Sequence, residues 1–258
     1  MAPPIKEDML VNPEKQFLFF KPLKYAGTSV EHALLMSSGP DALCPGSLDG
    51  FDNVEYEERN NTFVVDGEPH LRFAQHTYPE MFFSRIGNPD FFKGFYKISM
   101  VRNPWSALVS YYWWCVRSPD YFPSEHVELI SDGDSKRDVQ MKFEKLLTMA
   151  SSYVHEPIAE SMGFDKDIAS PLIFFLETNK RFFVDVIDYY IKFENIENDF
   201  TDLCNKLNIE RQQLPRHKSN LKKANFHYSD YYSDWVKRQV KDSFYDLIKQ
   251  YDYSFNGE

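Results

Sequence analysis

Short apolar segments alternate with helix-like segments along this chain, and this alternation restricts the fold more than any other feature. Three apolar segments have the length and the polar flanks of buried strands. Each is followed by a segment with helical apolar spacing or a good helix-starting residue. Strands are predicted at residues 16–20, 95–101 and 182–193 (ending near 191–193), and helices at residues 28–36, 105–116 and 195–207. The alternation favours the α/β class, with a central parallel sheet flanked by helices on both faces.

Residues 1–258 contain no repeat, low-complexity tract or linker, so a single domain is expected. Residues 1–15 are charged and proline-bearing, which favours a flexible N-terminal segment. Residues 117–137 are polar and rich in acidic side chains, and we predict a lid or a loop on the acceptor side there. A short strand near residues 62–65, helices at residues 141–153 and 231–251, and a basic loop at residues 214–226 complete the prediction.

The composition excludes several classes of partner. A net charge of −10 argues against non-specific binding to nucleic acid or anionic membranes, since both need a basic surface. The three cysteines are widely spaced, with no metal-ligand pattern and no disulfide framework, which favours a reducing, cytoplasmic compartment. The sequence shows no signal peptide and no apolar run of about 18 residues, so we expect no membrane span.

The segment KPLKYAGTS at residues 21–29 lies between a predicted strand and a predicted helix. That position suits an anion, because backbone N–H groups and the helix dipole point to it. Gly27 permits close approach of the backbone, Thr28 and Ser29 add hydroxyl donors, and Lys24 adds a positive charge. The segment is not a Walker A loop, because Lys24 precedes the glycine instead of following it. Taken alone, it is also compatible with an ordinary capped loop.

A second polar group lies in MVRNPWSALVSYY at residues 100–112. Arg102 comes directly after a predicted strand, and Pro104 suits the first turn of the helix that follows. Ser110 lies eight residues after Arg102, which is about two helical turns. A guanidinium can bind a phosphate through two hydrogen bonds and a hydroxyl can complete such a site.

Taken together in this order, the two segments resemble the sulfotransferases that use 3′-phosphoadenosine 5′-phosphosulfate (PAPS), specifically the carbohydrate-type branch of the P-loop-like superfamily. The first resembles the family's Pro-Lys-Thr-Gly-Gly-Thr-Ser loop: Lys24, Gly27, Thr28 and Ser29 match, while Tyr25 and Ala26 replace the usual Thr and Gly. The second resembles its Val-Arg-Asp/Asn-Pro motif with a serine eight residues after the arginine. The resemblance implies a P-loop-like nucleotide-binding topology, and PAPS as donor with adenosine 3′,5′-bisphosphate as product.

The resemblance also implies roles for individual residues. Residues 24–29 would bind the 5′-phosphosulfate, Arg102 and Ser110 the 3′-phosphate, and Lys218 in the late basic loop would lie near the nucleotide. His76 would be the catalytic base, and Lys24 would also neutralise the leaving phosphate oxygen. Other candidate bases for the acceptor proton are His32, His217, Glu31 and Glu80, although carboxylates need a raised pKa for that task at neutral pH.

We therefore expect in-line transfer of a sulfuryl group to a hydroxyl or amine of a small, neutral or cationic acceptor, such as a saccharide, an alcohol or an amine. No metal is expected, because no metal-ligand cluster is evident in the sequence. Two alternatives remain open. One is a nucleotide-binding protein of this fold without activity. The other is a P-loop-type nucleotide kinase, which would need a lysine after the glycine loop and an acidic metal ligand at a strand end.

Overall fold

The computed structural model describes residues 9–38, 54–57, 62–65, 76–85, 89–117, 128–149, 170–215 and 225–256. Its contacts divide the chain into two compact units. Unit 1 comprises residues 1–101 and 181–217, and unit 2 comprises residues 102–180 and 218–258. Each unit is assembled from segments that are distant in the sequence, so the division does not follow domains arranged one after another along the chain.

Unit 1 contains a four-stranded sheet in the order β1-β2-β5-β6. β2 pairs in parallel with β5, and β5 pairs in parallel with β6, whereas β1 is an antiparallel neighbour of β2. The predicted parallel α/β sheet is thus confirmed, with one antiparallel strand added at its edge. Its strands are β1 (Leu10–Asn12), β2 (Phe17–Phe19), β5 (Tyr96–Val101) and β6 (Tyr189–Lys192).

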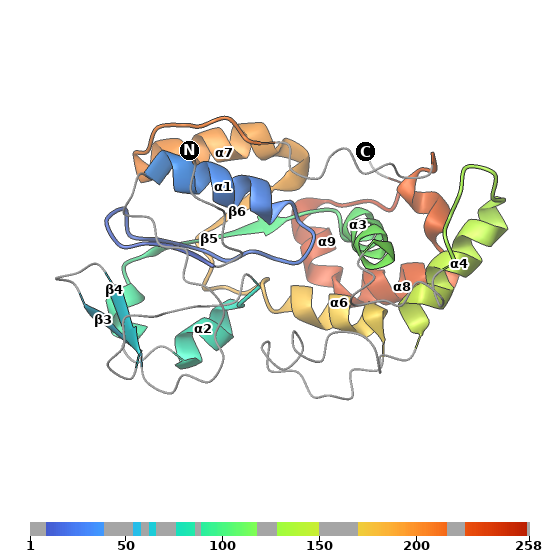
Figure 1. Ribbon diagram of the computed structural model, residues 1–258, viewed down its shortest axis with the longest axis horizontal. Coiled ribbons are helices and arrows are strands. Elements are labelled where there is room, and N and C mark those ends of the chain that lie inside the picture. The colour runs from blue at the N-terminus through green and yellow to red at the C-terminus, as the bar shows by residue number, and fades with distance from the viewer. Residues whose placement is uncertain are drawn as a thin grey trace. The chain divides into compact units, whose positions relative to one another are not determined.

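Helices of unit 1 lie on both sides of this sheet (Figure 1). α1 and α7 lie above it in that view, and α2 lies below it. α2 packs through Phe82, whose ring is edge-on to Phe20 at the end of β2, 5.8 Å between centroids. The unit also has a separate antiparallel hairpin. These elements are α1 (Gly27–Ser38), α2 (Pro79–Arg85), α7 (Ile196–Leu207), the short 3₁₀ helices η2 (Pro89–Phe92) and η4 (Phe193–Asn195), and the strands β3 (Val54–Glu57) and β4 (Thr62–Val65).

Among its described residues, unit 2 is helical, and aromatic side chains form much of its core. Phe143 is fully buried and its ring lies within 5.5 Å of the rings of Tyr112, Tyr231 and Tyr232. Aromatic residues make up 17% of the sequence, and in this unit they serve packing. The elements are α3 (Pro104–Val116), α4 (Lys136–Thr148), α6 (Pro171–Lys180), η5 (Tyr228–Tyr231), α8 (Asp234–Ser243) and α9 (Tyr245–Tyr251).

Several predicted boundaries were wrong. The N-terminal segment was expected to be flexible over residues 1–15, but Leu10 and Val11 are fully buried in β1. α4 begins five residues earlier than predicted, because Ser135 and Asp138 form a capping box. The predicted helix at residues 231–251 is divided at Phe244, which stands between α8 and α9. α2 and α6 were not predicted. Residues 118–127 of the predicted lid and residues 216–224 of the predicted basic loop lie outside the described residues.

Candidate active site

The loop between β2 and α1 contains two residues with a left-handed backbone conformation. Lys24 and Ala26 both have positive φ, 70° and 64°, which turns the chain sharply before α1 begins at Gly27. Ser29 N donates to the carbonyl of Ala26 at 3.1 Å within the first turn. The side chains of Lys24, Thr28 and Ser29 are partly exposed. The loop therefore presents a lysine and two hydroxyls at a helix N-terminus, where an anion is favoured.

Lys21 lies beneath this loop and was not singled out from the sequence. Its Nζ donates to Glu31 Oε2 at 2.6 Å, and the two side chains are only 3% and 1% exposed. A Cβ at position 27 would lie 2.2 Å from Lys21 Cγ. The lysine stem thus passes so close to the loop that only glycine fits at position 27, and this contact explains the requirement for Gly27.

Tyr25 stands where the resemblance places a threonine, and its side chain faces the protein interior. The residue is fully buried, with its ring 6.0 Å from that of Phe183. Phe183 in turn stacks on Tyr190 of β6 at 6.0 Å. The tyrosine therefore anchors the loop to the sheet, and only its backbone is left to contact a ligand.

His76 lies against the start of the same loop. Its Nδ1 is 2.8 Å from the backbone carbonyl of Lys21. Because a carbonyl oxygen only accepts hydrogen bonds, this contact requires a proton on Nδ1. In the neutral ring the lone pair then resides on Nε2. The structure thus brings His76 to the loop between β2 and α1 and selects the tautomer in which Nε2 is the basic nitrogen.

The other candidate bases differ in their surroundings. Glu31 is buried and engaged by the ammonium of Lys21. Glu80 is exposed in the first turn of α2. His32 is half-buried on α1, directly after Glu31. His217, like the predicted nucleotide-binding residue Lys218, lies outside the described residues.

Arg102 and Ser110, the predicted 3′-phosphate residues, belong to unit 2. Arg102 follows the carboxyl end of β5, and Ser110 lies on α3 with its side chain partly exposed. The guanidinium of Arg102 donates from Nε and Nη2 to Ser106 Oγ, at 3.1 and 2.8 Å. Ser106 was missed in the sequence, although its position one turn before Ser110 places both hydroxyls on one face of α3.

Asn103 explains the remainder of this motif. Its side-chain oxygen accepts from the N–H groups of Trp105 and Ser106, which caps α3, while Pro104 occupies the first helical position. Asn103 Nδ2 donates to the carbonyl of Ser254 at 2.8 Å. The asparagine thus fixes the start of the helix that carries Ser106 and ties it to the C-terminal segment.

Comparison with known proteins decides the family. A family model described as "Sulfotransferase family" matches residues 7–255, nearly the whole chain. This chain belongs to the sulfotransferase family. Neither the curated proteins nor the solved structures gave a match. Family membership supports transfer of a sulfuryl group as the general chemistry.

The described residues of this sulfotransferase were also compared with the requirements of a metal site and of a membrane-spanning helix. Among the residues that the structure describes, no group of three or more His, Cys, Asp or Glu side chains is arranged to hold a metal ion. Within the same residues, no helix has the length and apolar character needed to cross a membrane.

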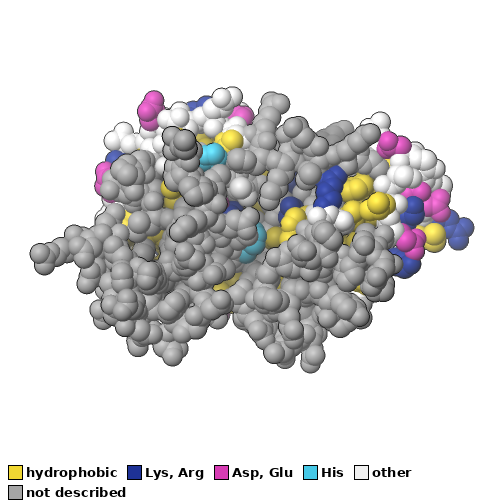
Figure 2. All heavy atoms as spheres, in the orientation of Figure 1, with side chains coloured by type: hydrophobic (Ala, Val, Ile, Leu, Met, Phe, Trp, Pro, Cys, Tyr) yellow, Lys and Arg dark blue, Asp and Glu magenta, His cyan; other side chains and the backbone are white. Residues whose placement is uncertain are grey.

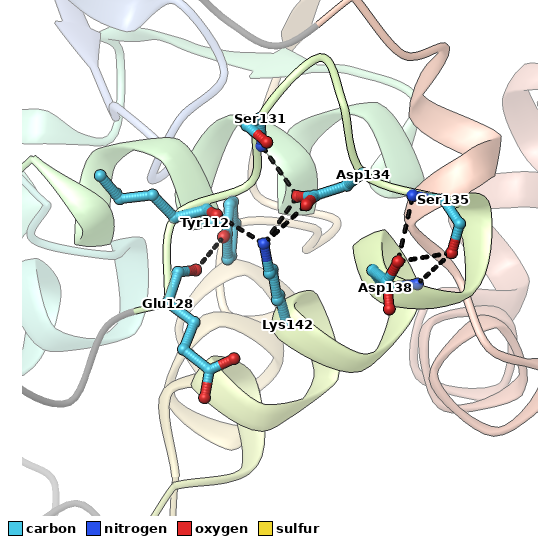
Figure 3. A network of polar contacts seen from close by, with 8 residues as sticks. Tyr112, Glu128, Ser131, Asp134, Ser135, Asp138 and Lys142 are labelled. Carbon is cyan, nitrogen blue, oxygen red and sulfur yellow. Dashed lines mark hydrogen bonds and ion pairs between the residues drawn. The ribbon is translucent and has the colours of Figure 1, made fainter.

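Residues 128–135 of the predicted lid lie directly before α4 and are joined to that helix by hydrogen bonds and an ion pair (Figure 3). Asp134 accepts from Lys142 Nζ at 2.7 and 2.8 Å and from the N–H of Ser131 at 2.9 Å. The hydrogen bond from Lys142 is the main reason why the pKa of Asp134 lies below its usual value. Charged side chains of both signs gather over α4 at the right of Figure 2. These contacts connect the segment to α4, and its role as a lid stays a prediction.

Proposed function

We propose that this sulfotransferase transfers the sulfuryl group of PAPS to a hydroxyl or amine of a small acceptor. The proposal rests on the loop between β2 and α1, which we call the phosphate loop. A lysine and two hydroxyls stand there at the N-terminus of α1, and His76 Nδ1 contacts the backbone carbonyl of Lys21. Such a loop binds a phosphate through backbone N–H groups, hydroxyls and a positive charge.

Each residue has a task in an in-line transfer. His76 Nε2 accepts the proton of the acceptor as the acceptor atom bonds to sulfur. The bond between sulfur and the bridging phosphate oxygen breaks, and Lys24 neutralises the charge that develops on that oxygen. Arg102 and Ser110 bind the 3′-phosphate and thereby reject donors that lack it. The protein supplies position and charge, and the donor supplies the reactive sulfuryl group.

An acceptor screen with radiolabelled PAPS, read by mass spectrometry, tests the activity. Saccharides, alcohols and amines are the classes to include, since the net charge of −10 disfavours polyanionic acceptors. Sulfated product with at least one of them is expected. If PAPS remains intact with every class while the protein still binds adenosine 3′,5′-bisphosphate, the chain is a nucleotide-binding protein without activity.

The kinase alternative is tested by removing metals. Since Lys24 can neutralise the leaving oxygen, sulfuryl transfer should persist in EDTA. Activity that disappears in EDTA and returns with magnesium, with ATP as the better donor, would favour a nucleotide kinase.

Lys24→Ala should reduce turnover much more than it weakens binding of adenosine 3′,5′-bisphosphate. Lys24 meets charge that grows only as the bond to sulfur breaks, and such interactions affect turnover more than ground-state binding. Initial rates and calorimetry on the same variant measure both quantities. Wild-type turnover in this variant would remove Lys24 from the mechanism.

A further inference from the structure

The buried lysine Lys21 contacts three parts of the candidate site at once. Its ammonium is paired with Glu31 of α1 at 2.6 Å. Its stem lies under Gly27, where an added Cβ would come within 2.2 Å of Lys21 Cγ. Its backbone carbonyl is 2.8 Å from His76 Nδ1. A displacement of Lys21 would therefore change the contacts of α1, of the phosphate loop and of His76.

Stability alone is a weak reason for this ion pair. Lys21 and Glu31 are 3% and 1% exposed, so both charges have lost nearly all of their contact with water. Desolvation of such a pair offsets much of its attraction, and apolar residues of similar size are often as stabilising. An apolar pair would pack equally well but would not fix the orientation of its side chains. A hydrogen-bonded ion pair at 2.6 Å, in contrast, restricts the lysine side chain to a narrow range of conformations.

We propose that Lys21 and Glu31 are positioning residues that hold the phosphate loop and the His76 ring in their reactive arrangement. The role of His76 in this statement rests on the function proposed above. The ion pair keeps the stem of Lys21 under Gly27, which supports the turn formed by Lys24 and Ala26. It also keeps the carbonyl of Lys21 directed at Nδ1, which leaves the lone pair of His76 on Nε2.

The test replaces the pair by an apolar one, Lys21→Met with Glu31→Met, which removes both charges together and leaves neither unpaired. Two properties of the protein are then measured without turnover. One is the tautomer of His76, from the ¹⁵N NMR shifts of its ring assigned with His76→Gln. The other is the affinity for adenosine 3′,5′-bisphosphate, from calorimetry.

Lys97→Met is the matched control. Lys97 is also a buried lysine of unit 1, and its Nζ donates to the carbonyls of Phe95 and Lys93 at 2.7 and 3.2 Å. It lies on β5, and its side-chain contacts are with those carbonyls and with Asp188. The control therefore reports what the loss of a buried ammonium does to the unit in general.

We expect a single Nδ1–H tautomer in the wild type and in the control, and a mixture of tautomers in the double variant. Nucleotide affinity should fall about tenfold in the double variant only. Turnover of the double variant should fall by about 10²-fold, since small displacements of reacting groups reduce rates by that factor. A folded double variant with the wild-type tautomer and affinity would overturn the proposal. Equal losses in Lys97→Met would also overturn it.

If the double variant does not fold, Glu31→Gln decides the question. The amide keeps the size of the side chain and an oxygen that can accept from Lys21, but it removes the charge. A partial mixture of His76 tautomers is then expected, and an unchanged tautomer would assign the pair to stability alone. A separate outcome, altered tautomers with no sulfuryl transfer in the wild type, would contradict the proposed function and leave the positioning role standing.

Discussion

Arg102 donates two hydrogen bonds to a single hydroxyl, that of Ser106, from Nε at 3.1 Å and from Nη2 at 2.8 Å. Ser106 lies in the first turn of α3, and Ser110 lies one turn further along the same face. The guanidinium is thus held beside the helix face that carries both hydroxyls. If Arg102 binds the 3′-phosphate as proposed, this orientation favours binding, because an oriented guanidinium loses less conformational freedom when it binds an anion.

Ser106→Ala should weaken binding of adenosine 3′,5′-bisphosphate by up to about tenfold, since hydrogen bonds to charged groups contribute roughly 1.5 to 3 kcal/mol and part of this remains in the variant. Affinity for adenosine 5′-monophosphate should not change, because that nucleotide has no 3′-phosphate. Calorimetry with both nucleotides makes the comparison. Ser110→Ala is the companion variant. If both substitutions change the affinity for the two nucleotides by the same factor, the 3′-phosphate assignment is wrong.

The sequence was most informative where a residue type has few roles. The strand, loop and helix over residues 17–38 were predicted from the apolar segment before Lys24 and from Gly27 and Thr28 after it. Lys21 could not be assigned, because a lysine beside a strand is normally exposed and its partner Glu31 lies ten residues away. Ser106 was hidden for another reason, since a serine in the first turn of a helix usually indicates capping.

Short secondary-structure elements were the part of the fold that the sequence predicted least well. β1 has three residues, Leu10–Asn12, and is fixed by its pairing with β2, which no local pattern reveals. α2 has seven residues and is held by aromatic contacts such as that of Phe82 with Phe20. The division of the C-terminal helix at Phe244 also depends on packing, since the ring of Phe244 is buried against Phe175 of α6. Tertiary contacts of this kind override local propensity.

Ala26→Gly should stabilise the free protein. Ala26 has a φ of 64°, a conformation that costs a residue with a Cβ roughly 1 to 2 kcal/mol and glycine nothing. The extra freedom of glycine in the unfolded chain offsets about 0.4 to 1 kcal/mol of this gain. A net increase of up to about 1 kcal/mol in the free energy of unfolding, measured by urea denaturation, is expected.

Ala33→Gly is the matched control for that measurement. Ala33 lies inside α1 with 1% of its surface exposed, and glycine at such a position destabilises by about 1 kcal/mol or more. The two substitutions should therefore have opposite signs. Destabilisation by both would contradict the idea that the loop is strained at Ala26.

Asp134→Asn should lower stability near neutral pH, and the loss should disappear in acid. The hydrogen bond from Lys142 is the first cause that holds the pKa of Asp134 below its ordinary 3.8 in the folded protein. A carboxyl with a depressed pKa contributes stability that is fully present above 3.8 and is lost as the pH falls through the folded-state pKa. Thermal unfolding of both proteins between about pH 2 and pH 7 measures the difference.

Asp138→Asn separates the contribution of charge from that of hydrogen bonding. The pKa of Asp138 is also depressed, but mainly by hydrogen bonds from the uncharged Ser135. Added salt should therefore shrink the effect of Asp134→Asn more than that of Asp138→Asn. The same salt dependence for both variants would show that the ion pair with Lys142 does not account for the shift.

His76→Ala should reduce turnover by a factor on the order of 10² to 10⁴, the usual contribution of a positioned base. Nucleotide affinity should hardly change, because Lys24 and Arg102 remain. His32→Ala is the paired control, since His32 lies on α1 one turn beyond the loop and should leave most of the activity. Both variants are tested by initial rates across pH, on the acceptor that the screen identifies. An inactive His32→Ala variant together with an active His76→Ala variant would assign the role of base to His32. An amine acceptor already deprotonated at the assay pH needs a base less than an alcohol does, so the loss in His76→Ala should be larger with an alcohol than with such an amine.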